Sequence, residues 1–340
     1  MKKKSILMIK SVYTGLGGHD KVIENISKEL QNLNYEITLG AFEFRQKPPS
    51  GISQITLSRL PFLNTKIINK FDIIHTHEPS MNYYFLFSKK PIVFHYHGIN
   101  GLLQKINLNL SLILNKKIKK IISVSKTSES YLKKISSNKL ITVIYNGIDI
   151  TFFQPKTNIP STNFPRLLFV GNLYHSKNVK TLIDNFTYLQ KYFPSLILDI
   201  IGDGDSFSEL SRIISKMNFK NKINLLGKKS HSELPSYYSS CDVFISASTA
   251  EANPLPPLEA MACGKPILLS QIPAHKEIIE NSNGGLLFDP NNPHDIVKKL
   301  ESIHRDYGNF SKNGLNFTSN NTWKKTCKKL DSVYDSIFYD

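Results

Sequence analysis

The most constraining feature of this sequence is a repeated alternation between short β-branched runs and segments with the periodicity of amphipathic helices. Buried strands of parallel sheets have this continuous apolar character, and helices form the crossovers between them. The alternation runs once to residue 144 and starts again at residue 166. Two series in tandem predict an α/β protein with two doubly wound parallel sheets. A length of 340 residues agrees, because it exceeds what one hydrophobic core usually holds.

The predicted elements follow from these runs. The first series of strands covers residues 5–9, 36–41, 72–76, 92–95, 120–124 and 141–144, and the second covers 166–170, 197–201, 223–226, 243–246, 266–269 and 286–288. Helices are expected at 19–31 and 126–134, and the proline-containing stretch 146–165 is expected to be a linker. The segment 322–338 has one apolar helical face and must therefore pack on another part of the protein.

Charge is distributed unevenly along the chain. Residues 1–160 hold 23 basic and 9 acidic residues, so most of the net charge of +16 lies in the first half. This distribution favours an anionic partner. Nucleic acid is disfavoured, because only five of the 43 basic residues are arginines, whose guanidinium geometry suits base and phosphate recognition. A general bias toward Lys, Asn and Ile is the alternative explanation.

The cysteines and the hydropathy pattern bear on the compartment. Three cysteines without a CxxC pair fit free thiols in a reducing compartment. The apolar run at 6–9 is too short for a signal peptide, and no stretch approaches the roughly 18 apolar residues of a spanning helix. The segment 102–122 joins an apolar run to four lysines, which predicts either an interfacial segment or a core helix with a solvated end. The expected location is the cytoplasm, with peripheral contact to the inner face of the cytoplasmic membrane.

A glycine-rich loop follows the first predicted strand. Gly15, Gly17 and Gly18 precede a predicted helix, and the free amides of a helix N-terminus favour a phosphate group. A dinucleotide fingerprint fits poorly, because the third glycine is missing at the required offset. The loop therefore predicts either a phosphate contact or a turn shaped by glycines alone.

Two His-x-His pairs, His75 with His77 and His95 with His97, follow successive predicted strands. Residues i and i+2 of an extended chain share a face, so each pair offers two imidazoles on one side. Zinc is one interpretation, but no HExxH or CxxC motif supplies further ligands. The preferred prediction is that one or two of the four histidines hydrogen-bond a substrate and that no metal is bound.

The strongest chemical pattern lies in the second half. Lys177 follows a predicted strand that exits through Gly171, and it is well placed to neutralise a diphosphate. Glu251 and Glu259 flank a proline-rich loop whose amides, around residues 253–258, predict an anion site. Carboxylates accept hydrogen bonds from adjacent sugar hydroxyls, so this loop predicts a nucleotide sugar as ligand. Surface glutamates that only cap a helix are the plainer alternative.

Motifs along almost the whole chain resemble those of the large retaining glycosyltransferase family 4. They are GLGG, DIIHTHEP, VFHYHG, ISVSK, VIYNGID, LLFVGNLYHSK, LDIIGDGD, INLLGKKSH, CDVFISAS, the Glu-x7-Glu loop and GGLLFDP. The resemblance implies the GT-B fold, with two facing Rossmann-like domains and a C-terminal helix that crosses back. It implies an acceptor-binding domain of residues 1–155 plus 322–340 and a nucleotide-sugar-binding domain of residues 160–320.

The same resemblance implies roles for individual residues. His97 is similar to the family's histidine near the reacting sugar, Glu251 to the donor-sugar ligand and Glu259 to the ribose ligand. Lys177 is similar to the diphosphate ligand. The other implied donor contacts are Gly17, Gly18, Gly171, Asn172, Lys228, Asn253, Pro254 and Leu255, with 227–229 as the base-binding turn.

The sequence departs from the family pattern at two places. Asn172 stands where the family commonly has an arginine, which leaves the diphosphate either to Lys177 alone or to Lys177 with Lys228. Glu-Ala-Asn-Pro replaces Glu-Gly-Phe-Gly at 251–254, which reshapes the donor-sugar pocket. The Asp-Gly-Asp at 203–205 resembles the family's strand exit rather than a metal-binding DxD motif.

The expected activity is transfer of a hexose or N-acetylhexosamine, with retention, from a nucleotide diphosphate sugar to a saccharide or lipid-linked saccharide acceptor. UDP is the expected nucleotide, and bacterial surface polysaccharide synthesis, of lipopolysaccharide or capsule, is the expected setting. No cofactor and no metal is expected, because Lys177 and helix dipoles would carry the leaving diphosphate. The alternatives are an epimerase or hydrolase on the same fold, and a nonenzymatic protein that binds a nucleotide sugar or a metal.

Overall fold

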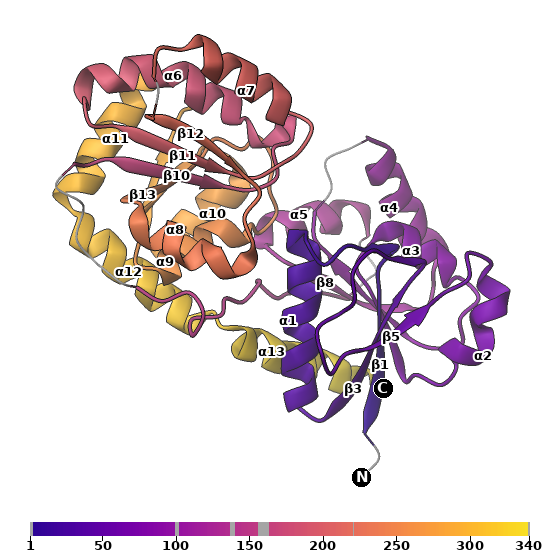
Figure 1. The fold of residues 1–340 in the computed structure, drawn as a ribbon. Helices are drawn as coiled ribbons and strands as arrows, with labels where there is room; N and C mark the ends of the chain where they lie inside the picture. Colours follow the sequence, from indigo (N-terminus) through magenta and orange to yellow (C-terminus); the bar gives the residue numbers. More distant parts are fainter. Residues whose placement is uncertain (1–2, 99–101, 137–139, 156–162, 220, 339–340) are drawn as a thin grey trace. The chain divides into compact units, whose positions relative to one another are not determined.

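The computed structural model describes residues 3–98, 102–136, 140–155, 163–219 and 221–338 (Figure 1). The chain divides into two compact units. The first unit comprises Met1–Gly147 and Trp323–Asp340, and the second unit comprises Ile148–Thr322. Residues 156–162 of the predicted linker lie outside the described residues.

The first unit is built on a seven-stranded parallel sheet with the order β5-β3-β1-β6-β7-β8-β9. Its strands are β1 (Lys4–Ile9), β3 (Tyr35–Ala41), β5 (Ser53–Thr56), β6 (Ile73–Thr76), β7 (Ile92–Tyr96), β8 (Ile118–Ser123) and β9 (Leu140–Val143), and two short strands, β2 (Val12–Tyr13) and β4 (Glu43–Phe44), pair with each other. Its helices are α1 (Gly18–Asn32), α2 (Thr65–Ile68), α3 (Pro79–Tyr84), α4 (Leu102–Leu114), α5 (Lys126–Ile135) and α13 (Trp323–Phe338).

The C-terminal helix α13 completes the first unit. Cys327, Leu330 and Tyr334 are buried on the face that the apolar pattern of 322–338 indicates, and the helix packs against α1. The hydroxyl of Tyr35 on β3 donates to Asp331 at 2.6 Å. A segment almost three hundred residues away in sequence therefore covers part of the first sheet, which is the burial that its apolar face requires.

The second unit is built on a six-stranded parallel sheet with the order β12-β11-β10-β13-β14-β15. Its strands are β10 (Arg166–Val170), β11 (Ile197–Ile201), β12 (Ile223–Gly227), β13 (Val243–Ser246), β14 (Ile267–Ser270) and β15 (Gly285–Phe288). Its longer helices are α6 (Val179–Tyr192), α7 (Phe207–Lys216), α8 (Leu234–Ser240), α9 (Leu255–Ala262), α10 (Pro273–Ser282), α11 (Pro293–Arg305) and α12 (Tyr307–Asn320). Counted along the chain, the strand order is 3-2-1-4-5-6, which is that of the Rossmann fold.

Alternate strand residues divide the core of the second unit into two layers. Leu167 and Phe169 of β10 pack with α6, α7 and α11 on one face of the sheet. Leu168 between them packs with α8, α9 and α10 on the other face. Figure 1 shows these two groups of helices on opposite sides of the sheet. A fully buried parallel sheet is therefore the reason for the continuous apolar runs in the sequence.

The boundary between the units corrects the expected end of the first domain at residue 155. Ile148 and Phe153 are buried in the core of the second unit. The amide of Ile148 donates to the carbonyl oxygen of Asn321 at 2.9 Å. These residues belong to the second unit because their apolar side chains are buried there.

The segment 102–122 does not form one continuous interfacial helix. Helix α4 ends at Leu114, and the chain enters β8 at Ile118, which is buried together with Ile121. Lys119 and Lys120 therefore lie on a strand of the first sheet. No helix within the described ranges combines the length and the hydropathy that crossing a bilayer requires.

Candidate functional site

Several predicted donor residues of the second unit follow the carboxyl ends of its strands. Gly171 and Asn172 follow β10, Lys228 follows β12 and Glu251 follows β13. Since the strands are parallel, these ends lie at one edge of the sheet, where doubly wound folds bind their ligands. Asn172 and Lys228 are exposed at this edge. The topology therefore gathers residues that are far apart in sequence.

Glycines hold the loops of this edge close together. The amide of Gly171 donates to Ile201, and that of Gly202 donates to Gly227, both at 3.0 Å. Gly202 has φ +153°, and a Cβ atom there would lie 1.9 Å from the carbonyl oxygen of Gly171. The backbones after β10 and β11 therefore approach so closely that only glycine fits at this position.

Lys177 and Glu251, the predicted ligands of the diphosphate and the donor sugar, form an ion pair with 2.5 Å between Nζ and Oε1. Lys177 ends the short 3-10 helix η2 (His175–Lys177), and both side chains are largely buried. The amide of Thr249 donates to the carbonyl oxygen of Ser176 at 2.8 Å, which joins the two loops. The carboxylate holds the ammonium group in place, and an anionic ligand could replace it as the partner of Lys177.

Glu259 is a buried carboxyl group on α9. The hydroxyl of Tyr238 on α8 donates to its Oε2 at 2.6 Å. Burial raises the pKa of Glu259 to about 7, although the hydrogen bond from Tyr238 acts in the opposite direction. Because α9 begins at Leu255, Glu259 lies in the second turn of this helix. Its carboxyl group changes charge near neutral pH.

The raised pKa of Glu259 predicts that the protein loses stability as pH rises from about 5 to 8. Between the ordinary value of 4.5 and about 7, the folded protein keeps the proton and the unfolded chain has released it. The free energy of unfolding therefore falls by on the order of 3 kcal/mol across this pH range. Urea unfolding at pH 5 and pH 8 should show this fall in wild type relative to Glu259→Gln, and an identical pH dependence in both proteins would contradict it.

The predicted anion-binding loop ends at the N-terminus of α9. Pro254 is the N-cap and Leu255 the first helical residue, and both are half-buried, as is Asn253. Pro254, Pro256 and Pro257 have no N–H, so Leu255 provides the free amide of the first helical turn, which carries partial positive charge. Gly264, with φ +73°, ends the helix as expected for a glycine after the C-cap.

The glycine loop of the first unit has a fixed shape. Gly17 is the N-cap of α1 and Gly18 its first residue. Asp20 accepts hydrogen bonds from the amide of Thr14 at 3.1 Å and from Lys10 Nζ at 2.5 Å. Burial would raise the pKa of Asp20, but the hydrogen bonds from Lys10 and Thr14 outweigh burial and lower it. A Cβ atom at Gly18 would meet nothing within 4 Å, so the space beside the helix start is open.

His97 follows β7 and contacts other histidines. Its Nε2 lies 2.9 Å from Nδ1 of His77, which follows β6. Its ring lies 4.4 Å from that of His95 and 4.7 Å from that of His19 at the start of α1, centroid to centroid. Burial and the neighbouring imidazoles lower the pKa of His97 well below its usual value. His97 is therefore a neutral group that forms hydrogen bonds.

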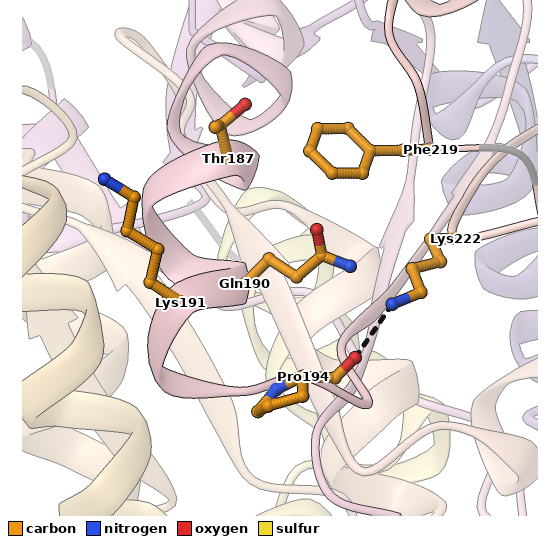
Figure 2. A pocket seen from close by; sticks show the side chains of 6 residues that line it. All are labelled: Thr187, Gln190, Lys191, Pro194, Phe219 and Lys222. Atoms are coloured by element: carbon orange, nitrogen blue, oxygen red, sulfur yellow. Dashed lines mark hydrogen bonds between the residues drawn. The ribbon is translucent and has the colours of Figure 1, made fainter.

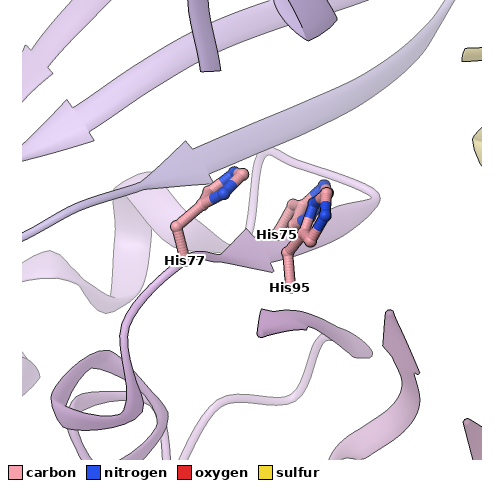
Figure 3. Close-up of side chains that lie close together, drawn as sticks. All are labelled: His75, His77 and His95. Carbon is pink, nitrogen blue, oxygen red and sulfur yellow. The ribbon is translucent and has the colours of Figure 1, made fainter. Parts of the chain in front are cut away.

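The two His-x-His pairs merge into one cluster, because β6 and β7 are neighbours in the sheet. His75 stacks on His77 at 4.5 Å and on His95 at 5.3 Å between ring centroids. Figure 3 shows the three rings projecting to the same side of the strands that carry them. Each pair stands out in the sequence, but only the pairing of β6 with β7 brings the two pairs together.

A hollow elsewhere on the second unit contains none of the predicted site residues (Figure 2). Its volume is about 350 Å³, and it is lined by Thr187, Gln190, Lys191, Pro194, Phe219 and Lys222. Lys222 Nζ donates to the carbonyl oxygen of Pro194 at 2.9 Å. Pro194 precedes the amino end of β11, so this hollow lies away from the carboxyl edge.

Family models match both units. The model described as Glycosyl transferases group 1 matches residues 149–320, which is more than half of the chain. The model described as Glycosyltransferase Family 4 matches residues 16–152. The chain belongs to the glycosyl transferases group 1 family, and its two Rossmann-like units have the GT-B fold. The protein is therefore a glycosyltransferase.

Individual relatives agree with this assignment. An uncharacterized glycosyltransferase of Methanocaldococcus jannaschii is 27% identical, and the alignment covers 98% of each chain. The O-antigen chain mannosyltransferase of Salmonella typhimurium is 27% identical over 61% of this chain and 57% of its own. An Anabaena protein crystallised with UDP-glucose has a TM-score of 0.81 at 19% identity, with 98% of this chain and 99% of that chain covered.

Proposed function

We propose that the second unit binds a nucleotide sugar, with UDP as the nucleotide, and that the enzyme transfers its hexose or N-acetylhexosamine. The ion pair between Lys177 and Glu251 at the carboxyl edge of the second sheet is the observation that carries this proposal. It places a cation for a diphosphate beside a carboxylate for sugar hydroxyls. The UDP-glucose complex of the Anabaena protein, which has the same fold, supports the choice of nucleotide.

The proposed roles follow from the chemistry of each group. Lys177 exchanges its partner Glu251 for the diphosphate, which releases that carboxylate to accept hydrogen bonds from the transferred sugar. Glu259, in its ionised form, accepts hydrogen bonds from the two ribose hydroxyls. The backbone N–H groups of Asn253 and Leu255, on either side of Pro254, are proposed to add partial positive charge beside the phosphates.

We propose that transfer proceeds with retention by front-face displacement. The acceptor oxygen bonds to the anomeric carbon as the bond from that carbon to the diphosphate oxygen breaks, and the departing oxygen takes the acceptor's proton. In the proposed donor complex, Glu251 accepts hydrogen bonds from the transferred sugar and Glu259 from the ribose, so neither carboxylate is assigned as a nucleophile. Positioning and charge stabilisation then supply most of the rate, and no metal takes part in this step.

The first unit is proposed to bind the acceptor, a saccharide or lipid-linked saccharide of a bacterial surface polysaccharide. The O-antigen mannosyltransferase among the relatives supports this setting. His97 is proposed to hydrogen-bond the reacting sugar as a neutral imidazole, because its low pKa prevents it from carrying charge near neutral pH. Gly17 and Gly18 open the helix whose free amides would contact a phosphate group.

An exposed apolar stripe on α4 supports a membrane-bound acceptor. Leu103 and Ile113 are 77% and 66% exposed, and the stripe also includes Ile106, Leu110 and Leu114. The opposite face of α4 is buried through Leu108 and Leu112. Exposed lysines at 105, 116 and 117 accompany the stripe. Such a surface binds at the interface of an anionic bilayer.

The double variant Leu103→Asn/Ile113→Asn should weaken binding to phosphatidylglycerol-containing vesicles by roughly 10-fold or more, since two apolar side chains no longer enter the bilayer. Cosedimentation with vesicles measures the loss. Leu140→Asn, which changes an equally exposed leucine on β9, is the matched control and should bind like wild type. Equal binding by the double variant would exclude α4 as the membrane contact.

The proposed reaction is tested by incubating the protein with UDP-, GDP- and ADP-sugars and lipid-linked acceptors, and by reading the anomeric configuration of the product by NMR. Transfer from a UDP-sugar with the donor's configuration supports the proposal. Inverted product would contradict the front-face mechanism. Donor turnover that is independent of acceptor would instead identify an epimerase or hydrolase.

A further inference from the structure

We propose that His75, His77 and His95 bind a divalent metal ion of the zinc class inside the first unit. Their side chains are almost completely buried, with 0%, 3% and 1% exposed. One ring nitrogen of each lies within 4.8 Å of those of the other two. These three imidazoles come from the ends of two neighbouring strands, so the sheet itself holds them together (Figure 3).

The ring nitrogens of this cluster are short of hydrogen-bond partners. Within the described part of the chain, Nε2 of His75, Nε2 of His77 and both ring nitrogens of His95 have none. Buried polar atoms are nearly always paired, so four unpaired nitrogens in one cluster indicate a missing partner. A metal ion would take one lone pair from each ring and so satisfy three of the four at once.

The second ring nitrogen of His75 and that of His77 already have hydrogen-bond partners, as is common in metal-binding histidines. Nδ1 of His75 shares a hydrogen bond of 2.5 Å with the hydroxyl of Tyr334, and Nδ1 of His77 shares one of 2.9 Å with Nε2 of His97. Histidine ligands of metals commonly donate their second N–H to such a partner, which fixes the tautomer and leaves the other nitrogen for the metal. In both residues, the nitrogen left over is the unpaired Nε2.

The three imidazole ligands determine which kind of metal ion would bind. Three neutral imidazoles without a carboxylate suit zinc, copper or nickel and do not suit magnesium or calcium, which prefer oxygen ligands. At Zn–N distances of about 2.0–2.1 Å the three nitrogens lie roughly 3.3 Å apart, so binding requires the rings to rotate toward one another. A water molecule would complete a tetrahedral shell, as in other three-histidine zinc sites.

The proposed metal has a consequence for His97. With Nε2 of His77 on the metal, its Nδ1–H donates to Nε2 of His97, which places the proton of His97 on Nδ1. The metal would thus orient His97 without contacting it. This proposal rests on the geometry of the cluster and is independent of which nucleotide sugar the enzyme uses.

The test measures metal on the full-length protein. Chelator-treated protein is titrated with Co²⁺ and with Zn²⁺, and the bound metal is measured by visible absorption and by mass spectrometry of the metal content. We expect about one equivalent per chain, a d–d spectrum of imidazole-ligated cobalt, and a higher Tm in the presence of Zn²⁺. His95→Gln and His75→Gln should each lose most of this binding.

His275→Gln is the matched control, because His275 is also buried but lies in the second unit. It should bind metal like wild type. Wild-type protein that acquires neither the cobalt spectrum nor bound zinc would overturn the proposal, whatever the variants do. Undiminished binding by folded His95→Gln would overturn it as well, since the metal would then be held elsewhere.

Discussion

Replacing Lys177 by alanine is expected to lower kcat by roughly 10²–10³-fold, the size of effect seen when one charge-stabilising donor of a transition state is removed. The substitution removes the ammonium group that lies 2.5 Å from Glu251 and that is proposed to carry the charge of the leaving diphosphate. Initial rates of nucleotide release, measured with saturating donor and acceptor, give the effect. Near-normal turnover would exclude the phosphate role of Lys177.

Two companion variants separate charge stabilisation from structural damage. Lys180→Ala removes an exposed lysine of α6 that pairs with Asp184, and it should keep the wild-type rate. Lys177→Ala/Glu251→Gln removes both charges of the buried pair and so restores neutrality. It should remain slow, because it lacks both the cation proposed for the diphosphate and the carboxylate proposed for the sugar hydroxyls. A double variant that recovers turnover would show that the unpaired carboxylate alone caused the defect.

Replacing Glu259 by glutamine is expected to weaken the binding of a nucleoside diphosphate by roughly 10²-fold. An ionised carboxylate accepts both ribose hydroxyls, and hydrogen bonds to a charged group contribute about 1.5–3 kcal/mol each. The glutamine side chain has a similar shape but only one acceptor oxygen. Isothermal titration calorimetry with UDP at pH 8, where the wild-type carboxyl is mostly ionised, measures the change.

The control for Glu259→Gln is Glu280→Gln, which changes an exposed glutamate of α10 and should leave the affinity unchanged. Tyr238→Phe removes the hydrogen bond to Glu259 while the carboxyl group stays in place. It should have a smaller effect than Glu259→Gln. Equal affinity of Glu259→Gln and wild type would exclude Glu259 as the ribose ligand.

The sequence predicts the two sheets well because buried parallel strands are read directly from continuous apolar runs. The prediction missed β5, since this edge strand has exposed, polar side chains and no apolar run. The amphipathic face of 322–338 predicts a packed helix, but no local signal names α1 as its partner. The end of the first domain was misplaced because Ile148 and Phe153 are buried by residues far along the chain.

Parts of the candidate site could be predicted because they depend on local motifs. Lys177 and Glu251 each stand out in the sequence, but their ion pair joins loops 74 residues apart and becomes visible only in the folded protein. Tyr238, which donates to Glu259, has no motif of its own. The convergence of His75, His77 and His95 depends on the pairing of β6 with β7, which sequence periodicity does not determine.

Lys177 and Glu259 are the two side chains through which the second unit is proposed to bind a nucleotide sugar. The most direct test is the thermal stabilisation of wild type and Glu259→Gln by UDP-, GDP- and ADP-sugars, each with and without EDTA. A ligand at 100 times its Kd adds about 2.7 kcal/mol of stability, which raises Tm measurably. We expect UDP-sugars to raise the Tm of wild type by the same amount with and without EDTA, and we expect the variant to respond weakly. Wild-type protein whose Tm no nucleotide sugar changes would contradict the claim.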